Sequence, residues 1–181
     1  MTDISEVAAH EAVVSGSESD DGGPHGFSMV VFSGDLDRQI AAFIIANGAA
    51  AMELPVTMFF TFWGLNALRR DGPVPIANPK TTVEKMFGRM MPRGAEKLKL
   101  SHLNLGGLGT RMIKHEMEKK HVLDLPHLIQ TAREQGVHLV ACTMTMDLMG
   151  IRKEELLPGI EFGGVGTMVF ASDNSRSTLF I

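Results

Sequence analysis

The chain alternates short apolar runs with segments whose apolar residues recur at helical spacing. Residues 27–34, FSMVVFSG, form an apolar run that stops at Ser33 and Gly34, as a buried strand does before a turn. Residues 35–52 then place apolar side chains at positions 36, 40, 43 and 44, which predicts a helix. The chain therefore begins its fold as a strand followed by a helix.

The same alternation continues to the last residues. Further strands are predicted at 55–63, 137–142, 159–162 and 177–181, and further helices at 64–70, 82–91, 108–121, 124–136, 144–150 and 163–172. Strands that alternate with helices favour parallel βαβ units. The predicted fold class is α/β: an open, mostly parallel five-stranded sheet between helix layers, a three-layer α/β/α sandwich.

The N-terminal segment differs in composition from the rest of the chain. Residues 1–26 hold six acidic residues, no Lys or Arg, and few apolar residues to bury, so we expect a disordered acidic tail. Residues 27–181 are expected to form a single domain, since their length suits one core.

Charge and cysteine content narrow the class of protein. The formal net charge is −4, and removing the six acids of the tail from the 21 in the chain leaves 15 acids against 17 bases, which does not suit nucleic acid. One cysteine cannot form an internal disulfide, and no basic start precedes an apolar run at the N-terminus. We therefore expect a cytoplasmic protein.

The most apolar stretch, from Ile40 to Leu65, is long enough to suggest a membrane span. Asn47, Glu53 and Pro55 divide it into a helix-like half and a strand-like half, each too short to cross a bilayer. Buried parallel strands also read as continuous apolar runs, so membrane insertion is not favoured.

Cys142 is the first candidate for chemistry. It ends the predicted strand 137–142 and precedes a helical turn, and ligands and reactive groups gather at the carboxyl ends of parallel strands. The unpaired N–H groups of a helix start would favour a thiolate over a thiol. The alternative is a small buried side chain, since free cysteine is among the most buried residue types.

Three glycine-bearing turns, at 33–35, 104–110 and 162–167, are predicted at the same edge of the sheet. None completes a dinucleotide or P-loop motif, so a nucleotide site is weakly supported. Cys142, Met144 and Met146 are soft donors that would suit Cu(I), but no second cysteine or nearby histidine joins them, so no metal and no cofactor are predicted. No G-x-S-x-G elbow supports a serine hydrolase.

With these features, the chain resembles the DsrE/DsrF/DsrH-like family of small sulfur-handling proteins. The matching stretches are FSGDLD, TFWGLNALRR, MFGRMMPRG, LSHLNLGGLGTRMIKHEM, LVACTMTMDLMGI and FGGVGT. The resemblance implies the parallel α/β fold, a homo-oligomer, and relay of sulfane sulfur as a protein persulfide. That role would fall on Cys142 alone, which excludes transfer between two cysteines of one chain.

The resemblance also implies partners and a binding surface. Sulfur-donor and sulfur-acceptor proteins, rhodanese-like or TusA-like, would meet Cys142, and some relatives are associated with membranes. Residues at predicted strand ends or Gly-rich turns are candidates for lining the site: Gly34, Trp63, Gly107 and Gly164. Trp63 is also a candidate for the core.

Two functions remain open at this point. One is a sulfur carrier or sulfurtransferase acting through Cys142, and whether it is an enzyme is left undecided. The other is a non-catalytic oligomeric module that binds a small anion or nucleotide at the Gly turns, with Cys142 merely packed. The sequence specifies neither the donor and acceptor nor the direction of sulfur flow nor the number of subunits.

Overall fold

A computed structural model of the chain describes residues 25–77 and 79–181, so most of the expected tail lies outside the described residues. Five strands form one sheet in the order β4-β3-β2-β1-β5, and every pairing between them is parallel. The strands are β1 (Gly26–Val31), β2 (Val56–Phe60), β3 (His138–Cys142), β4 (Glu161–Gly163) and β5 (Ser175–Phe180).

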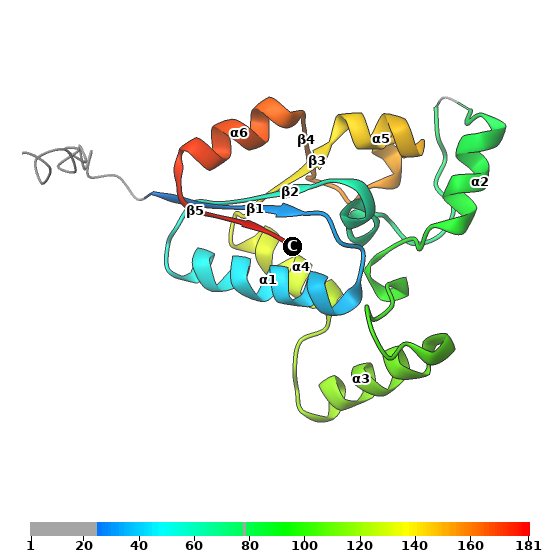
Figure 1. Ribbon diagram of the computed structural model, residues 1–181, viewed down its shortest axis with the longest axis horizontal. Helices are drawn as coiled ribbons and strands as arrows, with labels where there is room; N and C mark the ends of the chain where they lie inside the picture. Colours follow the sequence, from blue (N-terminus) through cyan, green and yellow to red (C-terminus); the bar gives the residue numbers. More distant parts are fainter. Residues whose placement is uncertain (1–24, 78) are drawn as a thin grey trace, which may run out of the picture.

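Helices cover both faces of the sheet (Figure 1). The helices α1 (Leu36–Ala51) and α4 (Leu125–Glu134) lie together on one face, and α5 (Thr143–Met149) and α6 (Val165–Asp173) lie on the other. The predicted three-layer α/β/α sandwich with a five-stranded parallel sheet is therefore confirmed.

Alternation along the inner strands divides the core into two clusters. On β3, Leu139 and Ala141 belong to the larger cluster, which also holds the buried side chains of α1 and α4. Val140 and Cys142 point to the opposite face and belong to a small cluster with Phe59 and Met168. This split follows from the two-residue period of a strand, because successive side chains face opposite layers.

The segment after β2 differs from the prediction. Instead of a strand reaching residue 63 and a helix from 64, β2 ends at Phe60 and a 3₁₀ helix, η2, spans Phe62–Leu68. The cause is a tight turn: Phe62 has a positive φ of 44°, and a Cβ on Gly64 would lie 2.2 Å from the carbonyl oxygen of Val31. The chain turns back against β1 before a longer strand can form.

After η2 the chain forms α2 (Thr82–Met90) and two short 3₁₀ helices, η3 (Ala95–Lys97) and η4 (Leu105–Gly107). η4 leads directly into α3 (Leu108–Lys119). Thr81 and Glu84 form a capping box that starts α2. Figure 1 shows α2 and α3 projecting from the sandwich, and neither has a buried residue. A last short 3₁₀ helix, η5 (Lys153–Glu155), follows α5.

The apolar stretch from Ile40 to Leu65 is divided between α1, β2 and η2. Among the described residues, no helix combines the length and the apolar character needed to cross a membrane.

Candidate functional site

Cys142 is the last residue of β3 and the residue that caps the start of α5. Its neighbour across the ladder is Gly163, the last residue of β4. The hydroxyl of Thr143 donates a hydrogen bond to the Gly163 carbonyl oxygen at 3.4 Å, which holds the start of α5 against the end of β4. The predicted position of the cysteine, at the carboxyl end of a parallel strand, is therefore what the structure shows.

The side chain of Cys142 is buried, with 4% of its surface exposed. It packs against Phe59, Val140 and Met168, and Met168 is the only residue of α6 in the buried core. On the adjacent helix α5, by contrast, Met144 and Leu148 are 61% and 66% exposed. The thiol is therefore buried in a small apolar cluster to which α6 contributes one methionine, Met168.

Gly34 and Trp63 meet at the next strand ends. A Cβ on Gly34 would lie 2.9 Å from the carbonyl oxygen of Trp63, so the two loops approach too closely for any larger residue. Both residues line an open hollow of about 320 Å³ that also includes Arg38, and Trp63 is 45% exposed. The structure brings this predicted pair together, while their role in binding stays a prediction.

Two hydrogen bonds tie the loop that leads to Trp63 to α5, the helix that follows Cys142. Thr61, just after β2, shares a 2.8 Å hydrogen bond with Thr145, and the Thr145 hydroxyl also accepts from the backbone N–H of Phe62. Thr145 lies in α5, three residues after Cys142. The ends of β2 and β3 are therefore held side by side.

The other two glycines lie in different places. Gly164 caps the start of α6, directly after Gly163, and so borders the end of the strand beside Cys142. Gly107, with a positive φ of 100°, turns the chain from η4 into α3, a helix that projects from the sandwich. Gly107 serves a helix start rather than a strand end.

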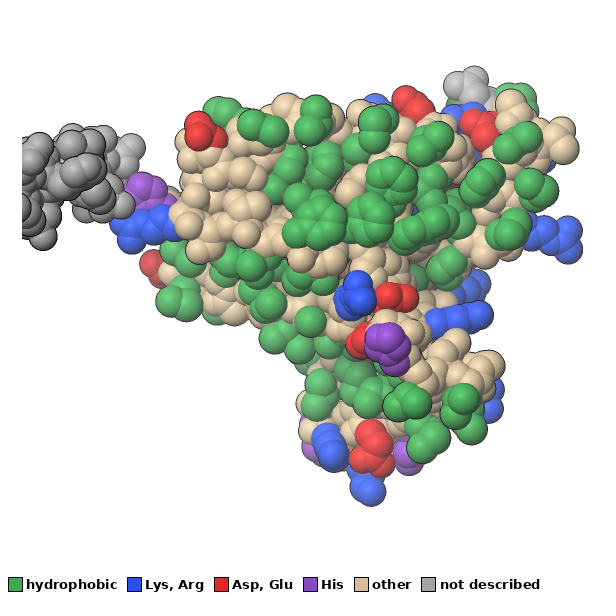
Figure 2. All heavy atoms as spheres, in the orientation of Figure 1, with side chains coloured by type: hydrophobic (Ala, Val, Ile, Leu, Met, Phe, Trp, Pro, Cys, Tyr) green, Lys and Arg blue, Asp and Glu red, His purple; other side chains and the backbone are tan. Residues whose placement is uncertain are grey.

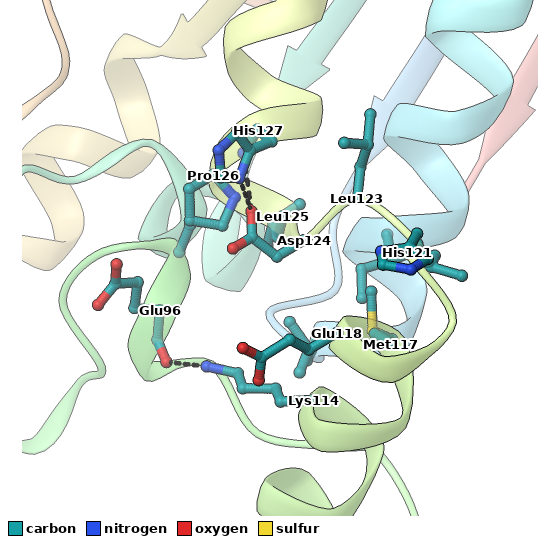
Figure 3. Close-up of a pocket in the computed structure, with 14 residues that line it drawn as sticks. Glu96, Lys114, Met117, Glu118, His121, Leu123, Asp124, Leu125, Pro126 and His127 are labelled. Carbon is teal, nitrogen blue, oxygen red and sulfur yellow. Dashed lines mark hydrogen bonds and ion pairs between the residues drawn. The ribbon is translucent and has the colours of Figure 1, made fainter.

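A cavity that Cys142 does not line is formed on the other side of the sheet, against α1 and α4. It measures about 630 Å³ and is formed by the end of α3 and the starts of α1 and α4, with apolar residues such as Leu36, Ile40 and Met117 in its lining (Figure 3). One of its polar groups is engaged in a local contact: the Lys114 ammonium donates to the Glu96 carbonyl oxygen.

The same holds for Asp124, which caps α4 at the rim of this cavity. Burial alone would raise the pKa of its carboxyl, but hydrogen bonds from the backbone and ring of His127 lower that pKa below its ordinary value. Across residues 25–77 and 79–181, no group of three or more His, Cys, Asp or Glu side chains could hold a metal ion. Within the described residues, the lining of this cavity therefore holds no such group of metal ligands.

Comparison with known proteins shows the family of this chain. The model of the DsrE/DsrF/DrsH-like family matches residues 25–180, which include every strand and Cys142. The chain belongs to this family. The YrkE protein of Bacillus subtilis (strain 168), described as uncharacterized, is 53% identical over 154 residues, which cover 85% of this chain and 95% of YrkE.

A second family relative is the sulfur carrier protein DsrE2 of Allochromatium vinosum. It is 32% identical over 161 residues, which cover 85% of this chain and 96% of DsrE2. Among solved structures, the ychN protein of E. coli superposes with a TM-score of 0.51 at 11% identity, over 87% of this chain and 99% of ychN. That likeness shows that the family fold is shared.

Sequence reasoning missed one buried feature of this family member. Glu155, Arg69 and Arg93 meet in an ion cluster, although Glu155 and Arg69 are 86 residues apart in the chain. Nothing in their spacing predicts the contact. The available signal was charge within apolar surroundings, since Arg69 follows NAL and Glu155 precedes LLPG.

Proposed function

We propose that this protein is a sulfur carrier that holds sulfane sulfur as a persulfide on Cys142. The observation that carries the proposal is the position of the chain's single cysteine, at the carboxyl end of β3 and under α6, in a member of a sulfur-handling family. The relative DsrE2, whose name describes a sulfur carrier protein, supports the same role.

The chemistry needs one nucleophile and no cofactor. The thiolate of Cys142 attacks the outer sulfur of a donor persulfide, R–S–SH, so that a new S–S bond forms on Cys142 while the donor's S–S bond breaks. The donor leaves as the thiolate R–S⁻, and the transferred sulfur keeps its hydrogen as Cys142–S–SH. An acceptor thiolate then attacks that outer sulfur in the same way, and Cys142 is restored. No oxidant is consumed in either step.

Burial determines how the thiol is reached. A side chain with 4% exposure cannot meet a donor in the resting structure, so part of its cover must move, and we propose that α6 is the part that moves. The attachment of α6 is thin: Met168 is its only buried residue, whereas Val165, Val169 and Phe170 are 76%, 61% and 72% exposed. Local opening of such a weakly packed element costs less than unfolding the domain.

The exposed face of α6 also supports self-association. Figure 2 shows hydrophobic side chains gathered over α6, α5 and the nearby end of the sheet. Phe180, which pairs with Val30 on this face of the sheet, adds to them with 71% exposure. Apolar patches of this kind on a small domain mark interaction surfaces. We propose a homo-oligomer, with sulfur-donor and sulfur-acceptor proteins, rhodanese-like or TusA-like, as transient partners.

Two further expectations belong to the same proposal. Residues 27–181 act as one domain, and the protein works in the cytoplasm, where a lone thiol stays reduced. An unpaired cysteine that is kept reduced is available to accept sulfur.

The proposal is tested by mass spectrometry of the intact protein. After incubation with a persulfide-loaded donor and removal of the donor, the wild-type chain should gain the mass of one sulfur, and a reducing thiol should remove it. Cys142→Ser should gain none, whereas Thr143→Val, a matched change of the next residue, should still be loaded. A wild-type protein that stays unmodified while its thiol alkylates readily would rule out the carrier role.

A further inference from the structure

Around Glu155 the structure assembles more positive charge than negative. The Glu155 carboxylate is 2% exposed and accepts from Arg69 at 3.2 Å, Arg93 at 2.7 Å and Lys80 at 2.5 Å. Arg69 is fully buried and Lys80 is 8% exposed. Three cations thus share one carboxylate in a water-poor environment.

A hollow of about 300 Å³ opens beside this cluster. The ionic side chains of its lining are Lys80, Lys85, Arg89 and Arg93 against Glu84 and Glu155. Four cations therefore face two carboxylates, and both carboxylates are already occupied, since Arg152 pairs with Glu84 at 3.0 Å. An excess of two positive charges remains at the hollow.

Two of the cations have no carboxylate partner among the described residues. Lys85 and Arg89 are four residues apart in α2, so they lie on one face of that helix, and the hollow is bounded by the same face at Gly88. Arg69 and Arg152 do not line the hollow but hold its two carboxylates, and each has a buried Nε atom without a hydrogen-bond partner within the described part of the chain. Lys85 and Arg89 are thus the two cations of the lining that no carboxylate in the described ranges compensates.

Lys85 and Arg89 are exposed at the edge of a buried ion cluster, so an anion that enters the hollow meets the excess positive charge of its lining. Guanidinium groups match the oxygens of tetrahedral anions in pairs, and an ammonium adds a point charge. We propose that the hollow binds a small tetrahedral oxyanion of the phosphate, sulfate or thiosulfate class, held mainly by Lys85, Arg89 and Arg93.

This site is separate from the sulfur-carrying position and does not depend on it. None of Cys142, Gly34, Gly107 and Gly164 lines the hollow. Its nearest link to the cysteine is α5: a Cβ on Gly150, at the end of that helix, would lie 2.5 Å from the side chain of Glu84. Seven helical residues, about 10 Å, separate that end from Cys142.

The test is calorimetric titration of the wild-type protein with phosphate, sulfate or thiosulfate, against chloride at equal ionic strength. At least one oxyanion should bind saturably at one site per chain, and the three titrations identify which chemistry is preferred. The double variant Lys85→Gln, Arg89→Gln should weaken that binding about 10-fold or more, because it removes two charge-assisted contacts.

The matched control is Arg111→Gln, Lys119→Gln, which removes two exposed cations from α3, outside the hollow. It should bind the oxyanion as the wild type does. Two results would overturn the proposal: no saturable binding beyond that of chloride, or an equal loss of binding in both double variants, which would show that affinity follows net charge and not this hollow. Thermal unfolding without added anion confirms that both variants are folded.

Discussion

Met168 controls access to Cys142 in this account. Met168→Ala removes the one buried side chain that α6 places over the thiol, and we expect a loss of about 2 kcal/mol in the stability of that local packing. The rate of Cys142 alkylation in the native protein should therefore rise about 30-fold, because local opening becomes easier by the same free energy.

The control for this change is Met58→Ala, in the larger core cluster on the opposite face of the sheet. It destabilises the whole domain but leaves α6 in place, so native alkylation should stay within about twofold of the wild-type rate. Equal acceleration by both variants would show that the thiol is reached only through global unfolding, and would argue against the local opening that we propose.

Glu155 is the residue on which the buried ion cluster depends. Glu155→Gln leaves Arg69, Lys80 and Arg93 without a compensating charge, so the free energy of unfolding should fall by about 3 kcal/mol. Glu154→Gln, an exposed neighbour, is the matched control and should change it little. Chemical denaturation measures the free energy of unfolding of both variants. An unchanged value for Glu155→Gln would contradict the dependence of the ion cluster on this carboxylate.

The same carboxylate makes stability depend on pH. Burial alone would raise the pKa of Glu155, but hydrogen bonds from the Arg152 backbone and Lys80, with the charges of Lys80 and Arg69, lower it below its ordinary value. A lowered pKa contributes stability above the ordinary value of 4.5, and that contribution is lost as the pH falls through the lowered value. The melting temperature of the wild type should therefore fall more steeply than that of Glu155→Gln from about pH 5 to about pH 3.

The element η2 packs closely against the end of β1 at Gly64. Gly64→Ala would place a Cβ 2.2 Å from the Val31 carbonyl oxygen, so the turn after β2 must shift, at a cost of about 3 kcal/mol. Gly48→Ala is the matched control, because nothing lies within 4 Å of a Cβ there, and it should stabilise α1 by up to about 1 kcal/mol. Thermal unfolding compares them; equal effects would contradict the close approach.

The elements also show how far sequence predicts this fold. Apolar periodicity located all five strands and the helices of the sandwich, because a buried parallel strand and an amphipathic helix each leave a local pattern. It misplaced the start of η2, since a turn that depends on contact between Gly64 and Val31 has no local signal. The Glu155 cluster was missed for the same reason. The place of Cys142 at the end of β3 was predicted because a strand end leaves a local pattern, while its chemical role stays a prediction.

For the whole molecule, the exposed face of α6 predicts self-association. Light scattering should give a mass above that of one chain at micromolar concentration, and Val165→Glu with Phe170→Glu should shift the protein toward the monomer, because it places charges in an apolar contact. The control is Met52→Glu, at the 74% exposed residue that follows the last turn of α1, and it should leave the mass unchanged. A wild-type monomer across this range would refute the assembly.

The measurement that tests the central claim most directly is the intact mass of the wild-type chain after exposure to a persulfide donor. The account predicts one added sulfur per chain, located at Cys142 by peptide mapping, removed by a reducing thiol, and absent in Cys142→Ser. A chain that gains no sulfur, with its cysteine shown to be reduced and open to alkylation, would contradict the account.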